Sequence, residues 1–281
     1  MNEIVAFNYI KAQRADEYLY FMRQIHIEKI VRPGGWGAAF IYPKSLRLFH
    51  DTSSLRSCSH FSSVITNRFE APIFLGGVSR IRLEDEENGL DSIQPIVRES
   101  NGHFWTFVQS GDLKINDNVC SDRFKSVGNS VGEKIFCRLM DVIANALHEL
   151  GGIKAASPYA LATCIAEETT SLTEYGEFNY ALTNGKLLFI HSHSGLYQKE
   201  DKFGVVFASR PASRENWQRI EPNTLLVVQD GKIVEVLPTH GRRMSEPGEA
   251  IGCEGGDDAL YLTWKDLINK SDDYDFDPNC G

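Results

Sequence analysis

The stretch that decides the fold is Met1–Phe7, which reads MNEIVAF. The apolar, partly β-branched run from Ile4 to Phe7 predicts a buried strand that starts within the first few residues. Chain ends fray unless a sheet holds them, so the pattern predicts that residue 2 lies at the edge of a core. One enzyme architecture uses this arrangement, because its nucleophile is the residue that becomes the N-terminus when Met1 is removed. In this chain that position is occupied by Asn2, whose side-chain amide is not a nucleophile.

Composition indicates an ordinary globular protein with an acidic balance. The chain has 281 residues, of which 42% are hydrophobic and 24% charged, and its net charge is -9. That charge argues against nucleic acid as a partner, because binding phosphate requires a basic face. We expect one domain over residues 1–270 and a flexible acidic tail over residues 271–281, since no repeat or low-complexity linker divides the chain.

Targeting and redox signals indicate a cytoplasmic protein. The N-terminal stretch lacks the basic and long apolar regions of a signal peptide. No apolar run approaches the ~20 residues of a membrane helix, so no membrane association is expected. The six cysteines form no CxxC pair and are expected to be free thiols.

The order of the expected elements favours an α+β fold with antiparallel sheets. Strands are expected early and late in the chain, and the two clearest helices, Gly132–Leu150 and Pro158–Leu172, lie between them. A further helix is expected over Ala15–Ile30, and a turn over Arg32–Gly35. The Asn184–Gly185 pair suits a type I′ hairpin turn. Few elements fit a repeating βαβ unit, which argues against a doubly wound sheet.

Familiar catalytic and metal motifs are missing from the sequence. No GxSxG elbow is present, and the glycines around Trp36 are expected to form a turn because no phosphate-loop Lys follows. The pairs Cys58/His60 and His191/His193 have ligand spacing, but two ligands are too few for a closed zinc site. We therefore expect no metal site and no cofactor.

The ordered pieces together resemble the class II glutamine amidotransferases of the N-terminal nucleophile hydrolase superfamily, in the stand-alone form. The resemblance covers roughly residues 2–237 and is most specific late in the chain. It rests on the first strand, the Gly-Trp-Gly strand with its Arg-Leu-Phe partner, the Phe-Asn-Tyr hairpin and the late run, namely Met1–Phe7, Gly35–Ala38, Leu46–Phe49, Phe178–Gly185 and Val205–Pro211.

The resemblance implies a four-layer αββα sandwich of two antiparallel sheets and the cleavage of glutamine. In active members an N-terminal Cys attacks with its α-amine as base. An Arg in a His-x-Arg segment binds the glutamine carboxylate, an Asn-Gly pair supplies oxyanion donors, and an Asp binds the α-amine.

Carried onto this chain, these positions have lost their chemistry. The nucleophile position is Asn2. The His-x-Arg segment falls on Gly77–Ser79; Arg80 follows, but a shift of one residue on a strand points to the opposite face. The Asn-Gly pair becomes Ser110–Gly111, and the Asp falls near Asn129. By family position the pocket would be lined by eight residues: Asn2, Trp36, Gly77, Ser79, Ser110, Gly111, Asn129 and Ser130.

Three hypotheses remain open. The first is a glutaminase-inactive relative that acts as a binding, structural or regulatory subunit, with a protein partner, a second copy of itself or a small polar ligand. The second is a different enzyme whose remodelled pocket, with Gln109 among its neutral polar residues, acts on another small molecule. The third is an active amidotransferase with Cys58 or Cys120 as nucleophile, although neither would have the α-amine base.

Overall fold

The computed structural model describes residues 2–24, 31–55, 58–82, 89–115, 123–212 and 216–239. The chain divides into two units, Met1–His240 and Gly241–Gly281. The expected domain boundary at residue 271 and the acidic tail lie outside the described residues. None of the described helices is long and apolar enough to cross a membrane.

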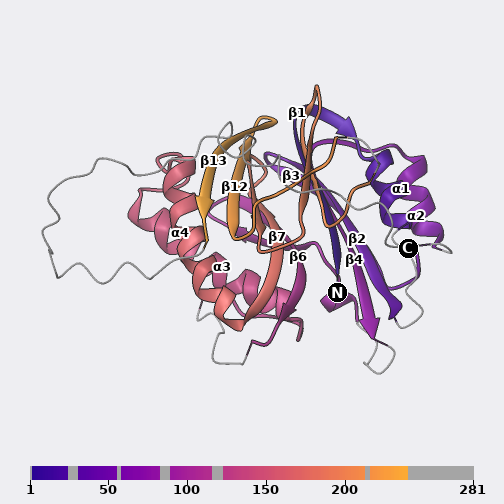
Figure 1. Cartoon of the computed structure of the whole chain (residues 1–281), viewed down its shortest axis with the longest axis horizontal. Helices are drawn as coiled ribbons and strands as arrows, with labels where there is room; N and C mark the ends of the chain where they lie inside the picture. Colours follow the sequence, from indigo (N-terminus) through magenta and orange to yellow (C-terminus); the bar gives the residue numbers. More distant parts are fainter. Residues whose placement is uncertain are drawn as a thin grey trace, which may run out of the picture. The chain divides into compact units, whose positions relative to one another are not determined.

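Two antiparallel sheets lie at the centre of the described unit (Figure 1). The first has the order β11-β9-β10-β1-β4-β2-β3. Its strands are β1 (Glu3–Arg14), β2 (Val31–Tyr42), β3 (Ser45–Asp51), β4 (Glu70–Arg82), β9 (Tyr197–Glu200), β10 (Gly204–Ala208) and β11 (Gln218–Arg219). The second has the order β13-β12-β8-β7-β6-β5. Its strands are β5 (Ile96–Ser100), β6 (His103–Leu113), β7 (Gly176–Thr183), β8 (Leu187–Ser192), β12 (Thr224–Gln229) and β13 (Lys232–Pro238).

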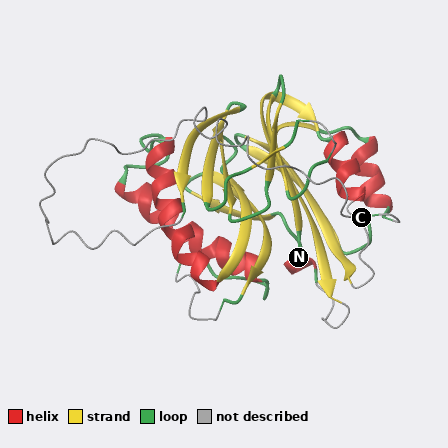
Figure 2. Cartoon of the chain, in the orientation of Figure 1, coloured by secondary structure: helices red, strands yellow, loops and turns green. Residues whose placement is uncertain are grey.

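Helices cover the outer face of each sheet (Figure 2). Helices α1 (Asp16–Gln24) and α2 (Ser59–Thr66) lie on the first sheet, and α3 (Val131–Glu149) and α4 (Pro158–Leu172) on the second. Two short 3₁₀ turns, Leu90–Ser92 and Thr173–Tyr175, complete the described elements. Three apolar clusters fill the spaces: one under each helical layer and one between the sheets. The expected four-layer αββα sandwich is therefore confirmed.

The first strand owes its place to its pattern of side chains. Every residue from Glu3 to Tyr9 is buried, because β1 pairs with β10 on one side and β4 on the other. Its alternate side chains pack on the two faces of the sheet: Val5 and Phe7 under the helices, Ile4 and Ala6 against the second sheet.

Helix α3 confirms the strongest helical pattern of the sequence. Ser130 caps its start, and its side chain accepts a hydrogen bond from the Glu133 N–H. Gly151 and Gly152 follow its end with φ of 78° and 97°, as expected of a glycine C-cap.

One local prediction was wrong, and a second is confirmed over the residues that the structure describes. The expected turn at Arg32–Gly35 belongs to strand β2, whose register against β4 shifts between Pro33 and Gly35. The glycines and proline that predicted a turn form a β-bulge within the strand instead. The helix expected over Ala15–Ile30 is described as α1 only to Gln24, and residues 25–30 lie outside the described part of the chain.

Candidate functional site

Strands β1 and β4 place three of the expected site residues together. Glu3 of β1 pairs with Val78 of β4, and Ile4 pairs with Gly77, so Asn2 lies beside the Ser79 end of β4. Alternation along a strand puts Gly77 and Ser79 on the face that carries Leu75, which points into the core between the sheets. Ser79 is buried there.

Strand β6 brings the next two positions from the second sheet. Val108 lies in the same core between the sheets. A Cβ built on Gly77 would lie 3.0 Å from the Val108 Cγ2 atom, so the two strands touch at this point. Ser110 is two residues further along β6, shares the face of Val108 and is buried. Ser79 and Ser110 therefore belong to facing surfaces of the two sheets.

The backbone conformation at position 111 requires a glycine. Its φ is 126°, a conformation that residues with a side chain rarely adopt, and a Cβ there would collide with the Glu177 carbonyl oxygen of β7. The glycine of the expected oxyanion pair is thus kept for the geometry of the strand.

Asn129 and Ser130 lie at the start of α3. The Asn129 side chain is exposed, and the Ser130 hydroxyl is used as the helix cap. Glu133 fixes the backbone just before α3, because its carboxylate accepts hydrogen bonds from the Val127 and Gly128 N–H groups at 2.9 Å and 2.8 Å. The same carboxylate pairs with Arg98 of β5, and only 3% of the Glu133 side chain is exposed.

The segment around Gln94, just before β5, lies on the sheet beside these residues. The main-chain carbonyl of Gln94 lies directly above Gly37, and a Cβ at Gly77 would lie 3.3 Å from it. The Gln94 side chain reaches the second sheet, where its Oε1 atom accepts a hydrogen bond from the Gln109 N–H. The glycines at 37 and 77 thus make room for the segment before β5, and a histidine at 77 would meet it.

His50 is a titratable group in contact with this segment. It pairs with Gly37 across β3 and β2, and its Nε2 atom lies 2.8 Å from the Pro95 carbonyl oxygen. Burial lowers the pKa of His50, and the hydrogen bond to Pro95 offsets part of that effect. A neutral imidazole at neutral pH adds no charge to the site.

The side chains of Trp36 and Gln109 do not point toward Ser79 and Ser110, although both were expected to line the pocket with them. The Trp36 ring lies on the opposite face of the first sheet, under the helices, with its centroid 4.8 Å from that of Phe61. Gln109 alternates with Val108 and Ser110, so it points toward α3, and a Cβ built on Gly132 would lie 3.1 Å from its Cγ atom. Strand alternation removes both from the face that carries Ser79 and Ser110.

The positions that remain together offer hydrogen bonds and no charge. Asn2, Ser79 and Ser110 carry amide or hydroxyl groups, and Gly77 and Gly111 carry no side chain. A free amino acid would need a cation for its carboxylate and an anion for its amine, and these five positions provide neither. The side chains at these positions can donate and accept hydrogen bonds with a neutral polar group, and none of the five is a thiol or an amine.

Comparisons with known proteins identify this architecture. Two antiparallel sheets between helical layers define the N-terminal nucleophile hydrolase fold, and solved structures share it. A predicted glutamine amidotransferase from Pseudomonas aeruginosa superposes with a TM-score of 0.58 at 17% identity, covering 83% of this chain and 99% of that one. The Bacillus subtilis glutamine phosphoribosylpyrophosphate amidotransferase gives 0.58 at 12% identity, over 86% of this chain and 50% of that one.

Sequence comparison gives the family. The class II glutamine amidotransferases match residues 23–199, so the chain belongs to this family. A candidate glutamine amidotransferase of Haemophilus influenzae is 22% identical over 77% of this chain and 78% of its own length. The candidate glutamine amidotransferase YafJ of Escherichia coli is 26% identical over 67% of this chain and 82% of its own length.

Proposed function

We propose that this chain is a member of the class II glutamine amidotransferase family that does not hydrolyse glutamine and acts as a binding or regulatory subunit. One observation carries the proposal. Asn2, Gly77, Ser79 and Ser110, at the edge between the two sheets, carry no thiol, no basic group and no charge.

Each loss removes a separate part of the family's reaction. Asn2 in place of the cysteine removes the covalent step. Ser79 in place of the arginine removes the partner of the substrate carboxylate, which is worth about 2–5 kcal/mol for a buried charged hydrogen bond. Ser110 in place of the asparagine removes a side-chain amide donor for the oxyanion. Restoring one residue therefore leaves the other two deficits.

The neutral edge also indicates what the protein would bind. Hydroxyl and amide groups recognise an uncharged polar group, such as an amide or a sugar hydroxyl, better than an amino acid zwitterion. A partner chain that inserts a polar loop would meet the same groups. We keep both a small polar ligand and a protein partner or second copy of the chain, with a cytoplasmic location.

The test is a glutaminase assay on the purified full chain with amide-labelled glutamine, beside an active family member. We expect no labelled ammonia above the buffer rate. Ammonia release that disappears in an S110A variant would refute the proposal.

A second candidate is an enzyme with another small-molecule reaction on the same scaffold. Buried Ser79 and Ser110 on facing surfaces favour it, since a hydroxyl pair could orient a substrate. A compound that stabilises the protein, and is turned over by the wild type but not by S110A, would establish this alternative; binding without turnover supports the binding subunit.

A further inference from the structure

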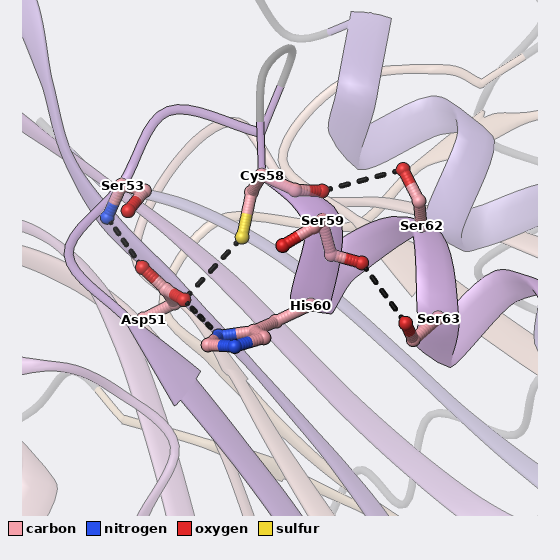
Figure 3. A network of polar contacts seen from close by, with 7 residues as sticks. All are labelled: Asp51, Ser53, Cys58, Ser59, His60, Ser62 and Ser63. Atoms are coloured by element: carbon pink, nitrogen blue, oxygen red, sulfur yellow. Dashed lines mark hydrogen bonds and ion pairs between the residues drawn. The ribbon is translucent and has the colours of Figure 1, made fainter.

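Three side chains with different metal-binding atoms meet at the outer edge of the first sheet (Figure 3). Asp51 is the last residue of β3, Cys58 immediately precedes α2, and His60 is the second residue of that helix. The Asp51 Oδ2 atom lies 3.3 Å from the Cys58 Sγ atom and 2.7 Å from the His60 Nδ1 atom. All three ligand atoms lie within 4.8 Å of one another.

The spacing suits a small tetrahedral ion. Zinc binds sulfur at about 2.3 Å and nitrogen or oxygen at about 2.0–2.2 Å, which puts neighbouring ligand atoms roughly 3.3–3.6 Å apart. The two distances from Asp51 are shorter, at 2.7 Å to His60 and 3.3 Å to Cys58, because each is a hydrogen bond. A rotation of the exposed His60 side chain would lengthen the shorter one.

The carboxylate is already held in a ligand-like position. The other oxygen of Asp51, Oδ1, accepts a hydrogen bond from the Ser53 N–H at 2.7 Å, which leaves Oδ2 to face the other two residues. Such outer contacts orient the ligands of metal sites.

Burial of the three residues differs in a way that provides an entry path. Cys58 is buried and Asp51 mostly so, with 13% of its side chain exposed, whereas 79% of the His60 side chain is exposed. A site walled on one side and open on the other can accept an ion and keep one coordination position for water.

We propose that Asp51, Cys58 and His60 bind one Zn²⁺ ion, with a water molecule as the fourth ligand. Binding would release the thiol proton of Cys58 to solvent, and the proton that His60 now directs from Nδ1 to Asp51 would be carried on Nε2 instead, so that Sγ, Nδ1 and Oδ2 each give a lone pair. The ion would replace two hydrogen bonds and join the end of β3 to the start of α2. Spacing along the chain indicated only the pair Cys58/His60, and the third ligand comes from the end of strand β3.

The test is zinc binding by the full chain, with Co²⁺ as a spectroscopic probe. We expect one zinc per chain after dialysis and a thiolate-to-cobalt charge-transfer band. Since Cys164 is a free thiol on α4, C164S is the control for C58S. The band must vanish in C58S and persist in C164S.

The histidine provides a second, folding-neutral variant. Because His60 is exposed, H60A keeps the fold, and exposed His148 at the end of α3 gives the control H148A. We expect zinc affinity to fall at least about tenfold in H60A and to stay unchanged in H148A. Zinc should raise the melting temperature of the wild type and not of H60A. Equal affinity in wild type and H60A, or no stoichiometric zinc in the wild type, would overturn the proposal.

Discussion

Replacing Glu133 should destabilise the segment that leads into α3 far more than replacing its partner Arg98. The E133A variant leaves the guanidinium of Arg98 without its carboxylate and the N–H groups of Val127 and Gly128 without an acceptor. Breaking a buried ion pair costs about 3–5 kcal/mol. Arg98 is 23% exposed and partly solvated, so we expect about 3 kcal/mol from E133A.

The R98A variant is the matched comparison. There Glu133 keeps its two backbone donors, each worth about 1 kcal/mol or more to a charged acceptor, so we expect a loss of only about 1–2 kcal/mol. Equilibrium urea unfolding at neutral pH measures both values from the midpoints at a common slope. Hydrogen exchange at the Val127 and Gly128 amides should quicken in E133A and change little in R98A. If R98A costs as much as E133A, or E133A costs less than about 1 kcal/mol, the assigned role of Glu133 is wrong.

Three further changes test other parts of the molecule. An alanine at Gly77 would crowd Val108 and the Gln94 carbonyl and should lower the free energy of unfolding by about 1–3 kcal/mol. An alanine at Gly37, where that carbonyl lies closer, should lower it more. Chemical denaturation measures both values, and the reverse order would contradict the placement of the Gln94 segment. Burial lowers the pKa of His191 from 6.5 to about 3, so the stability that its neutral form contributes is complete above pH 6.5 and is lost as pH falls toward 3. The free energy of unfolding of H191Q should therefore fall less steeply than that of the wild type between pH 6.5 and 3. Parallel curves for the two proteins would disprove this assignment. N2C should gain a thiol but no glutaminase activity, because the other positions stay neutral; labelled ammonia from N2C alone would show that Asn2 is the sole defect.

The fold followed from the sequence because its patterns are local and redundant. The run from Ile4 to Phe7 needed only its own apolar residues to indicate a buried strand, and α3 combines a long apolar face with a serine cap and paired glycines. The hairpin at Asn184 was placed correctly but its turn differs. Gly185 alone has positive φ, and the Asn184 side chain accepts hydrogen bonds from the Lys186 and Leu187 N–H groups.

The site was less predictable because it depends on contacts between distant strands. The family resemblance indicated Ser79 and Ser110, and strand alternation brings them to facing surfaces. It could not show that Trp36 faces the helices, because the bulge before it resembles a turn in sequence. Nor could local spacing join Asp51 to His60 and Cys58, since only the end of β3 brings the carboxylate to the helix.

The position of β1 in its sheet has a consequence for biosynthesis. The Ile4 N–H donates to the Ser209 hydroxyl, and Val5 pairs with Ala208, so the first strand meets its neighbour across about two hundred residues of sequence. During translation β1 can pair with β4 early, but its other edge must wait until β10 has left the ribosome. An apolar strand with an open edge invites pairing with other chains. We therefore expect the nascent chain to depend on chaperones until synthesis has passed β10, and the slow step of refolding to be the closure of this long-range pair.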